Sequence, residues 1–217
     1  MKINAIITAG GTSSRFGTKN KLLEKINGIE VIKYTVDAFR YSNADKIIIC
    51  ANISIMDELK NLFKDYTNID IIEGGNTRQQ SVYNGLRHEE CDYVIIHDGA
   101  RPVITTELIN VCIDTVKDVK ALSVMTKTID TIKEVEHGKI VKTIDRSKLY
   151  NTQTPQAFEY NLILSAHKKY EGQNFTDDAG MVEKMGDSVY VVDGSYRNIK
   201  ITTQSDIELA KVYLSSL

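Results

Sequence analysis

The sequence predicts an α/β protein whose mostly parallel β-sheet is covered by helices on both faces. The first half of the chain repeats strand, loop and helix at a period of roughly 25–30 residues, which is typical of βαβ units. Glycine-containing loops follow three of the predicted strands, and such loops gather at the carboxyl edge of a parallel sheet. The length of 217 residues suits one globular domain, 1–217, and no linker or low-complexity segment divides it.

Short apolar runs rich in β-branched residues predict the strands of the first half. These strands are expected at residues 3–8, 46–50, 69–72 and 93–96. Apolar residues at helical spacing, such as Ile55, Leu59 and Leu62, predict the helices between them. The helices are expected at residues 29–39, 55–63, 77–88 and about 105–116.

The second half of the chain is less regular. Residues 128–136 and 139–145 alternate polar and apolar side chains around His137-Gly138, which predicts a β-hairpin. The hairpin is too polar for the main sheet, so we expect an arm that projects at about residues 128–145. Residues 146–158 are expected to be irregular. The remaining predicted elements are strands at 121–125 and 189–192, helices at 161–170, 176–185 (capped by Thr176) and 205–214, and an extended segment at 198–202.

Composition argues against several classes of protein. Lys and Arg (27) against Asp and Glu (29) give a net charge of −2, which disfavours a nucleic-acid-binding protein but permits a local basic pocket. The cysteines Cys50, Cys91 and Cys112 have no CxxC spacing, so we expect reduced thiols in a cytoplasmic protein. No apolar segment approaches the ~18–20 residues of a membrane helix, and the N-terminus lacks a signal-peptide pattern, so we expect no membrane association.

The loop after the first strand contains Gly10-Gly11, followed by the cations Arg15 and Lys21. Glycine lets the backbone approach a ligand closely, and successive N–H groups form an anion-binding concavity. Two cations beside a polyphosphate can stabilise the charge that develops during phosphoryl transfer, although both could equally be solvated surface residues. The loop has neither P-loop nor G-x-G-x-x-G spacing. It therefore predicts a nucleotide or phosphate site of another kind.

The loop after the fourth strand offers a carboxylate and a further cation. Asp98 follows an apolar strand at the sheet edge, where it could bind Mg²⁺, or it could be a capping or loop carboxylate. Arg101 could bind a phosphate or a structural carboxylate. We expect His97 to be a hydrogen-bonded core histidine. The chain has no His/Cys set at zinc spacing and no G-x-S-x-G elbow, which argues against metal and serine hydrolases.

Several short motifs follow one another along nearly the whole chain. They are Ala9-Gly10-Gly11 through Arg15 to Lys21, residues 74–82, residues 97–102, Asp130-Thr131, Arg146, residues 153–156, residues 176–179 and residues 198–202. In this set the chain resembles the 2-C-methyl-D-erythritol 4-phosphate cytidylyltransferases of the non-mevalonate isoprenoid pathway. More widely, it resembles nucleotidyltransferases with a Rossmann-like, glycosyltransferase-A-like fold.

The resemblance implies a reaction of CTP with a polyol phosphate that gives a CDP-polyol and diphosphate, with Mg²⁺ as cofactor and no protein nucleophile. Arg15 and Lys21 match the catalytic cations of the family, and Asp98 matches its aspartate on the Mg²⁺ side. The nucleotide-binding positions are Ala9, Gly10, Gly11, Gly75, Asn76, Ser81 and Ala100. The polyol-phosphate positions are Arg101, Thr131, Arg146, Thr154 and Lys200. In the family the arm reaches across a homodimer, so Thr131 and Arg146 would complete the neighbour's site.

Some positions depart from the family pattern, and some alternatives stay open. Asn20 stands where proline is expected, Asn76 replaces a common aspartate, and Arg197 stands where several members have an aspartate, which adds a cation near the polyol end. One alternative is ribitol-5-phosphate cytidylyltransferase, a teichoic-acid enzyme with the same fold. Others are a non-catalytic nucleotide-binding module and a sugar-phosphate nucleotidyltransferase that uses UTP or GTP. Residues 176–181 resemble the isoprenoid enzyme more closely, so that enzyme is the principal prediction.

Overall fold

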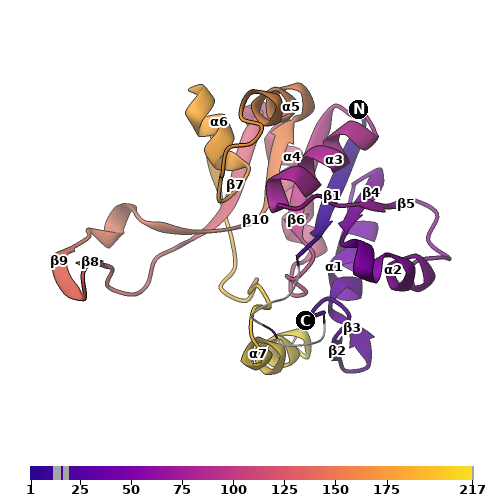
Figure 1. Cartoon of the computed structure of the whole chain (residues 1–217), viewed down its shortest axis with the longest axis horizontal. Helices are drawn as coiled ribbons and strands as arrows, with labels where there is room; N and C mark the ends of the chain where they lie inside the picture. The colour runs from indigo at the N-terminus through magenta and orange to yellow at the C-terminus, as the bar shows by residue number, and fades with distance from the viewer. Residues whose placement is uncertain (12–15, 17–19, 217) are drawn as a thin grey trace.

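A seven-stranded β-sheet forms the centre of the computed structural model, which describes residues 1–11, 16 and 20–216. Its strands are β1 (Ile3–Ala9), β4 (Lys46–Ala51), β5 (Ile69–Glu73), β6 (Tyr93–Asp98), β7 (Ala121–Lys127), β10 (Tyr150–Glu159) and β11 (Tyr190–Asp193). Their order is β11-β7-β10-β6-β1-β4-β5. Figure 1 labels the strands of this row from β7 to β5. Every pairing is parallel except those of β10, which is antiparallel to β6 and β7. The predicted mostly parallel α/β sheet is thus confirmed.

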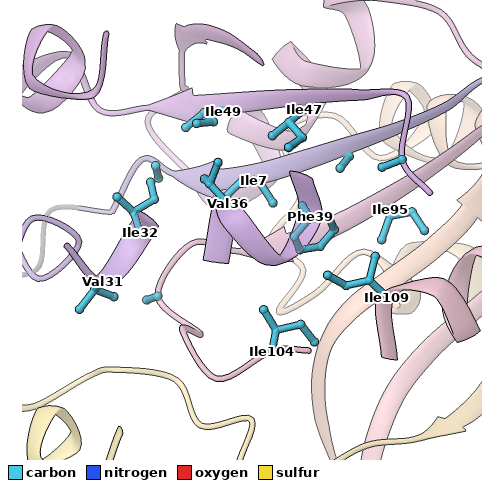
Figure 2. Close-up of a cluster of buried hydrophobic side chains, with 14 of the residues drawn as sticks. Ile7, Val31, Ile32, Val36, Phe39, Ile47, Ile49, Ile95, Ile104 and Ile109 are labelled. Carbon is cyan, nitrogen blue, oxygen red and sulfur yellow. The ribbon is translucent and has the colours of Figure 1, made fainter. Parts of the chain in front are cut away.

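Helices cover both faces of this sheet. They are α1 (Val31–Arg40), α2 (Met56–Leu62), α3 (Arg78–His88), α4 (Thr106–Val119), α5 (Tyr160–Lys169) and α6 (Ala179–Met185). The last helix, α7 (Gln204–Leu214), packs instead against the segment Lys25–Ile26. Because side chains alternate along a strand, neighbouring residues of β1 enter opposite layers. Ile7 shares a buried cluster with Phe39 of α1 and Ile109 of α4 (Figure 2). Ile6 belongs to a second cluster, with Val82 of α3.

The loops after β1, β5 and β6 meet at one edge of the sheet, as predicted. The N–H of Gly74, after β5, donates to the carbonyl of Ala51 at 2.7 Å. The N–H of Gly99, after β6, donates to the carbonyl of Thr8 at 3.0 Å. These bonds connect each loop to a neighbouring strand, so the glycine-containing loops lie side by side.

The predicted hairpin forms a two-stranded sheet of its own, β8 (Lys133–Glu136) and β9 (Lys139–Thr143). His137 and Gly138 occupy the turn with φ values of 48° and 78°, the left-handed conformation that a two-residue hairpin turn requires. The strands are shorter than the predicted ranges. Figure 1 shows the arm projecting away from the central sheet.

The prediction of an irregular segment at residues 146–158 is wrong for most of its length. A short 3-10 turn, Arg146–Lys148, precedes β10, which lies between β6 and β7. Ala157 and Phe158 are completely buried. Pro155 cannot donate a ladder hydrogen bond, and the pairing with β7 shifts register between Thr152 and Gln156. The strand therefore accommodates Pro155 at this irregularity.

Two predicted helices begin later than expected. The helix predicted from residue 176 begins at Ala179, and Asp178 rather than Thr176 is its N-cap residue. The helix predicted from residue 29 begins at Val31, because β2 (Lys25–Ile26) and β3 (Ile29–Glu30) form a small hairpin before it. The turn of this hairpin is Asn27-Gly28, a known hairpin signal that was not used to predict a hairpin here. Residues 198–202 join no strand, and a 3-10 turn, Ile53–Ile55, precedes α2.

None of the described helices combines the length and apolar character that crossing a bilayer requires.

Candidate active site

Two adjoining cavities open where the loops after β1, β5 and β6 meet. The first has a volume of about 350 Å³ and the second about 440 Å³. Arg78, Asp98 and Lys200 line both cavities and form their common wall. The rest of the first cavity is lined by Thr8, Ala9, Gly10, Gly11, Phe16, Lys21, Leu22, Gly75, Asn76, Thr77, Ser81, Ala100 and Thr202. The rest of the second is lined by Arg101, Met125, Thr152, Gln153, Thr154, Gln156, Thr176, Asp177, Gly180 and Glu183.

Most of the predicted site residues meet at these cavities. All seven positions predicted to bind nucleotide line the first cavity, as does Lys21. Arg101 and Thr154 line the second, and Lys200 lines both. Thr131 and Arg146 are exposed on and beside the arm and line neither cavity. Arg15 lies outside the described residues.

The wall of the first cavity needs glycine at particular places. The N–H of Gly75 donates to Ser81 Oγ at 3.0 Å, and that hydroxyl donates to the carbonyl of Thr77, also at 3.0 Å. A Cβ atom on Gly10 would lie 2.8 Å from Ser81 Oγ, so the hydroxyl would have to move away and its hydrogen bonds would be disturbed. The backbone of both glycine-containing loops, at Gly10 and Gly75, therefore packs directly against the side chain of Ser81 beside the first cavity.

Lys21 connects the first loop to a distant part of the chain. Its Nζ donates to the carbonyl of Ile201 at 2.6 Å. Ile201 in turn donates its N–H to the carbonyl of Ala100 at 2.8 Å. The segment before α7 thus joins the loops after β1 and β6 at the mouth of the first cavity.

Asp98 is surrounded by three cations. Lys200 Nζ lies 2.7 Å from Asp98 Oδ2, Arg78 Nε lies 3.2 Å from Oδ1, and Arg101 Nε lies 3.7 Å from Oδ2. Burial alone would raise the pKa of Asp98, but the charges of Arg78, Lys200 and Arg101 hold it well below its usual value. The carboxylate is therefore ionised at neutral pH and organises the cations around it.

Arg78 is the site residue that the sequence analysis missed. It lies within the predicted motif of residues 74–82, but no role was assigned to it. Besides Asp98, its guanidinium contacts the buried Asp178, with Nη1 2.7 Å from Oδ2. Burial opposes its charge, but Asp178 and Asp98 raise the pKa of Arg78 above its ordinary value. An arginine that opens a helix directly after a glycine loop was the available signal.

Two further predictions concern His97 and Arg197. His97 is a core residue, as predicted, with its ring beside the backbone of Arg101. Within the described part of the chain its ring nitrogens make no hydrogen bond of good geometry. Burial lowers the pKa of His97 to about 3, which keeps the ring neutral.

Arg197 lies against α7, where Nη1 donates to Ser216 Oγ at 3.2 Å, and it lines neither cavity. It therefore adds no cation to the candidate site.

Similarity to known proteins identifies the family of this chain. The family model described as 2-C-methyl-D-erythritol 4-phosphate cytidylyltransferase matches residues 3–216. The chain belongs to this family. Among curated members, the protein of that name from Clostridioides difficile (strain 630) is 41% identical over 98% of this chain and 93% of its own length. The one from Bacillus cereus (strain ATCC 10987 / NRS 248) is 40% identical over 96% of each chain.

Solved structures of the cytidylyltransferase family share the fold. The 4-diphosphocytidyl-2C-methyl-D-erythritol synthase of Anaerococcus prevotii superposes with a TM-score of 0.88 and 34% identity, covering 99% of this chain and 96% of that one. The Thermus thermophilus cytidylyltransferase gives 0.84 and 26%, with both chains fully covered. The Rossmann-like nucleotidyltransferase fold is therefore confirmed, and membership of a cytidylyltransferase family makes the chain a nucleotidyltransferase.

Proposed function

We propose that this chain joins CTP and 2-C-methyl-D-erythritol 4-phosphate to give 4-diphosphocytidyl-2-C-methyl-D-erythritol and diphosphate, in non-mevalonate isoprenoid synthesis. The observation that carries the proposal is the common wall of Arg78, Asp98 and Lys200 between two cavities. A reaction between two phosphate compounds needs two such spaces with cations where they meet. We assign the first cavity to CTP and the second to the polyol phosphate.

The proposed reaction is a direct displacement at phosphorus. An oxygen of the polyol phosphate attacks the α-phosphorus of CTP and forms a new P–O bond. The bond from the α-phosphorus to the bridging oxygen breaks, and diphosphate leaves with the electron pair. The attacking phosphate is already an anion, so catalysis depends on positioning and charge stabilisation. Lys21, at the first cavity, and Arg15 are the cations we assign to the triphosphate.

The glycine-containing wall of the first cavity supports a pyrimidine site. Gly10 and Gly75 line the cavity without a Cβ atom, and Ser81 holds the wall in place through its hydrogen bonds. We assign the nucleotide contacts to Ala9, Gly10, Gly11, Gly75, Asn76, Ser81 and Ala100, which all line the cavity. Arg101, Thr154 and Lys200 are assigned to the polyol phosphate.

Nucleotidyl transfer is generally assisted by a metal, and we propose Mg²⁺ bound on the side of Asp98. The described residues contain no group of three or more His, Cys, Asp or Glu side chains that could hold a metal alone. Mg²⁺ commonly uses one or two carboxylates together with substrate phosphates, and one ionised carboxylate beside the first cavity fits that mode. Once bound, the ion would neutralise charge on the phosphates, while Arg78 keeps Asp98 oriented.

We also propose that residues 1–217 form a single domain and that the arm of one copy packs on a second copy of the chain. Ile129, Val135, Ile140 and Val141 are each more than half exposed on or beside the hairpin. A projecting hairpin with apolar side chains and open edges favours pairing with another chain. In such a homodimer Thr131 and Arg146 would contribute to the neighbour's second cavity.

The free thiols of Cys50, Cys91 and Cys112 support a cytoplasmic location, which cell fractionation would test.

A diphosphate-release assay tests the proposed function. Purified protein is given CTP and Mg²⁺ with either 2-C-methyl-D-erythritol 4-phosphate or ribitol 5-phosphate, and then UTP, GTP or ATP in place of CTP. We expect the highest kcat/KM with CTP and the methylerythritol compound. Faster turnover of ribitol 5-phosphate, or no diphosphate release with either polyol, would contradict the assignment. Preference for UTP or GTP would instead indicate a different nucleotidyltransferase.

A further inference from the structure

A row of buried side chains leads from the common wall of the cavities into the protein interior. Arg78 lies in the middle of it, between Asp98 at 3.2 Å and Asp178 at 2.7 Å. His167 follows on the far side, with Nε2 3.2 Å from Asp178 Oδ1. The side chains of Asp178 and His167 are fully buried, and neither residue lines a cavity. The carboxylate of Asp178 contacts Arg78 and His167, so its charge reaches a ligand through Arg78.

Contacts from several elements fix the inner end of this row. The backbone N–H of Asp178 donates to Gln156 Oε1 of β10 at 3.0 Å. The ring of His167, on α5, is stacked on Tyr83 of α3, with 6.0 Å between centroids and 6° between planes. An ionised carboxylate only accepts hydrogen bonds, so the His167 nitrogen that faces Asp178 is a donor. Both oxygens of Asp178 are thus engaged, and Arg78 has a rigid partner.

The arrangement matters because the other partners of Asp98 can leave it. The side chain of Lys200 is 41% exposed, so it can turn toward a phosphate in either cavity. Arg101 lies farther from Asp98, at 3.7 Å, and lines the second cavity. When these cations bind substrate, Arg78 is the contact that still holds Asp98. Without Asp178, Arg78 would itself be drawn toward the phosphates.

We infer that Asp178 and His167 are positioning residues, which hold Arg78 in one orientation so that Arg78 keeps Asp98 in place between the two cavities. The inference rests on the proposed function, because that proposal supplies the role of Asp98. It predicts that changes deep in the α5–α6 region alter the reaction through Asp98 alone.

A double-mutant cycle tests this route. Asp178→Asn should lower kcat about 10–100-fold, as small misplacements of reacting groups do, and Asp98→Asn should lower it at least as much. The double variant should be no slower than Asp98→Asn, because both changes act on one group. If the two losses multiply in the double variant, Asp178 acts independently of Asp98 and the inference is overturned.

His167 allows a comparison that separates positioning from stability. His167→Gln keeps an N–H donor toward Asp178, so kcat should stay within about threefold of wild type, whereas His167→Met removes the donor and should approach Asp178→Asn. The matched control is Tyr170→Phe, which removes a 2.9 Å hydrogen bond from the end of α5 to the carbonyl of Lys184 in α6. The control should lower Tm without changing kcat/KM. Equal activity of the two His167 variants, or an equal kinetic loss in the control, would overturn the inference.

Calorimetric titration with CTP and Mg²⁺ gives a second measure that needs no turnover. Asp178→Asn should shift Kd in the same direction as Asp98→Asn, and the double variant should shift it no further. A Kd for Asp178→Asn equal to that of wild type would overturn the inference. A wild-type chain that binds CTP but transfers nothing to any polyol phosphate would overturn the proposed function instead, and the binding series would still decide the role of Asp178.

Discussion

Replacing Asp98 by asparagine keeps the size of the side chain and removes its charge. Three cations would then face one another around a neutral amide, since Lys200, Arg78 and Arg101 lie 2.7, 3.2 and 3.7 Å from the carboxylate. Arg78 would retain Asp178 at 2.7 Å, but the other two would lose their acidic partner at this site. We expect the folded state to be destabilised.

The magnitude follows from how deeply each partner is buried. Removing one member of a buried ion pair costs about 3–5 kcal/mol. The side chain of Lys200 is 41% exposed, so it can turn into water and its share is small. Arg101 is 10% exposed, and its charge is the one left without compensation. We therefore expect the free energy of unfolding to fall by about 3 kcal/mol at neutral pH, the lower end of that range.

The pH dependence of this loss has a definite sign. The pKa of Asp98 is held well below the value of about 3.9 that an unfolded aspartate has, chiefly because its cations outweigh the effect of burial. The stabilisation is therefore fully present above about pH 4 and is lost as the pH falls through the folded pKa. Between the unfolded and the folded pKa, the stability of the wild type falls by about 1.4 kcal/mol for each unit by which the pH falls, because Asp98 binds a proton only in the unfolded state. The variant lacks this group and loses nothing through it.

Urea unfolding followed by circular dichroism, from about pH 7 down to about pH 3, measures both quantities. The stability difference between wild type and Asp98→Asn should stay constant above about pH 4 and shrink below it. The control is Asp114→Asn, whose side chain is 69% exposed beside Lys117 and should change stability little. A loss no larger than that of the control, or a difference that grows in acid, would refute the reasoning.

Three further changes test other parts of the molecule. Lys21→Ala should lower turnover about 10²–10³-fold while the protein still folds, and near wild-type diphosphate release would contradict its role. Gly10→Ala introduces a Cβ atom 2.8 Å from Ser81 Oγ, so CTP affinity measured by calorimetry should fall roughly tenfold, and an unchanged Kd would mean that the wall can adjust. Ile140→Asp changes a side chain that is 65% exposed, so the protein should keep its wild-type circular dichroism spectrum while light scattering shows a monomer; a wild type that is already monomeric would rule out the crossed arm.

Local patterns in the sequence were sufficient for the strands and loops that build the first cavity. Buried β-branched runs marked β1, β4 and β6, and glycines marked the places where backbones approach closely. Because the carboxyl ends of parallel strands share one edge, the convergence of Gly10, Gly75 and Asp98 followed without any coordinates. The His137-Gly138 hairpin was equally local, since its turn conformation is set by two residues.

Only the tertiary structure decided how distant side chains pair. Arg78 and Asp178 are separated by 100 residues, and nothing near either one indicates the other. β10 is polar at its start and carries Pro155, yet it is a central strand, because its buried end pairs with β6 on one side and β7 on the other. Arg197 is directed to α7 by packing that its neighbours in sequence do not encode. The sequence determined which residues are available at the edge of the sheet. Packing determined which charged side chains lie together in a buried, low-dielectric space, and there the neighbouring charges control the pKa and the orientation of each group.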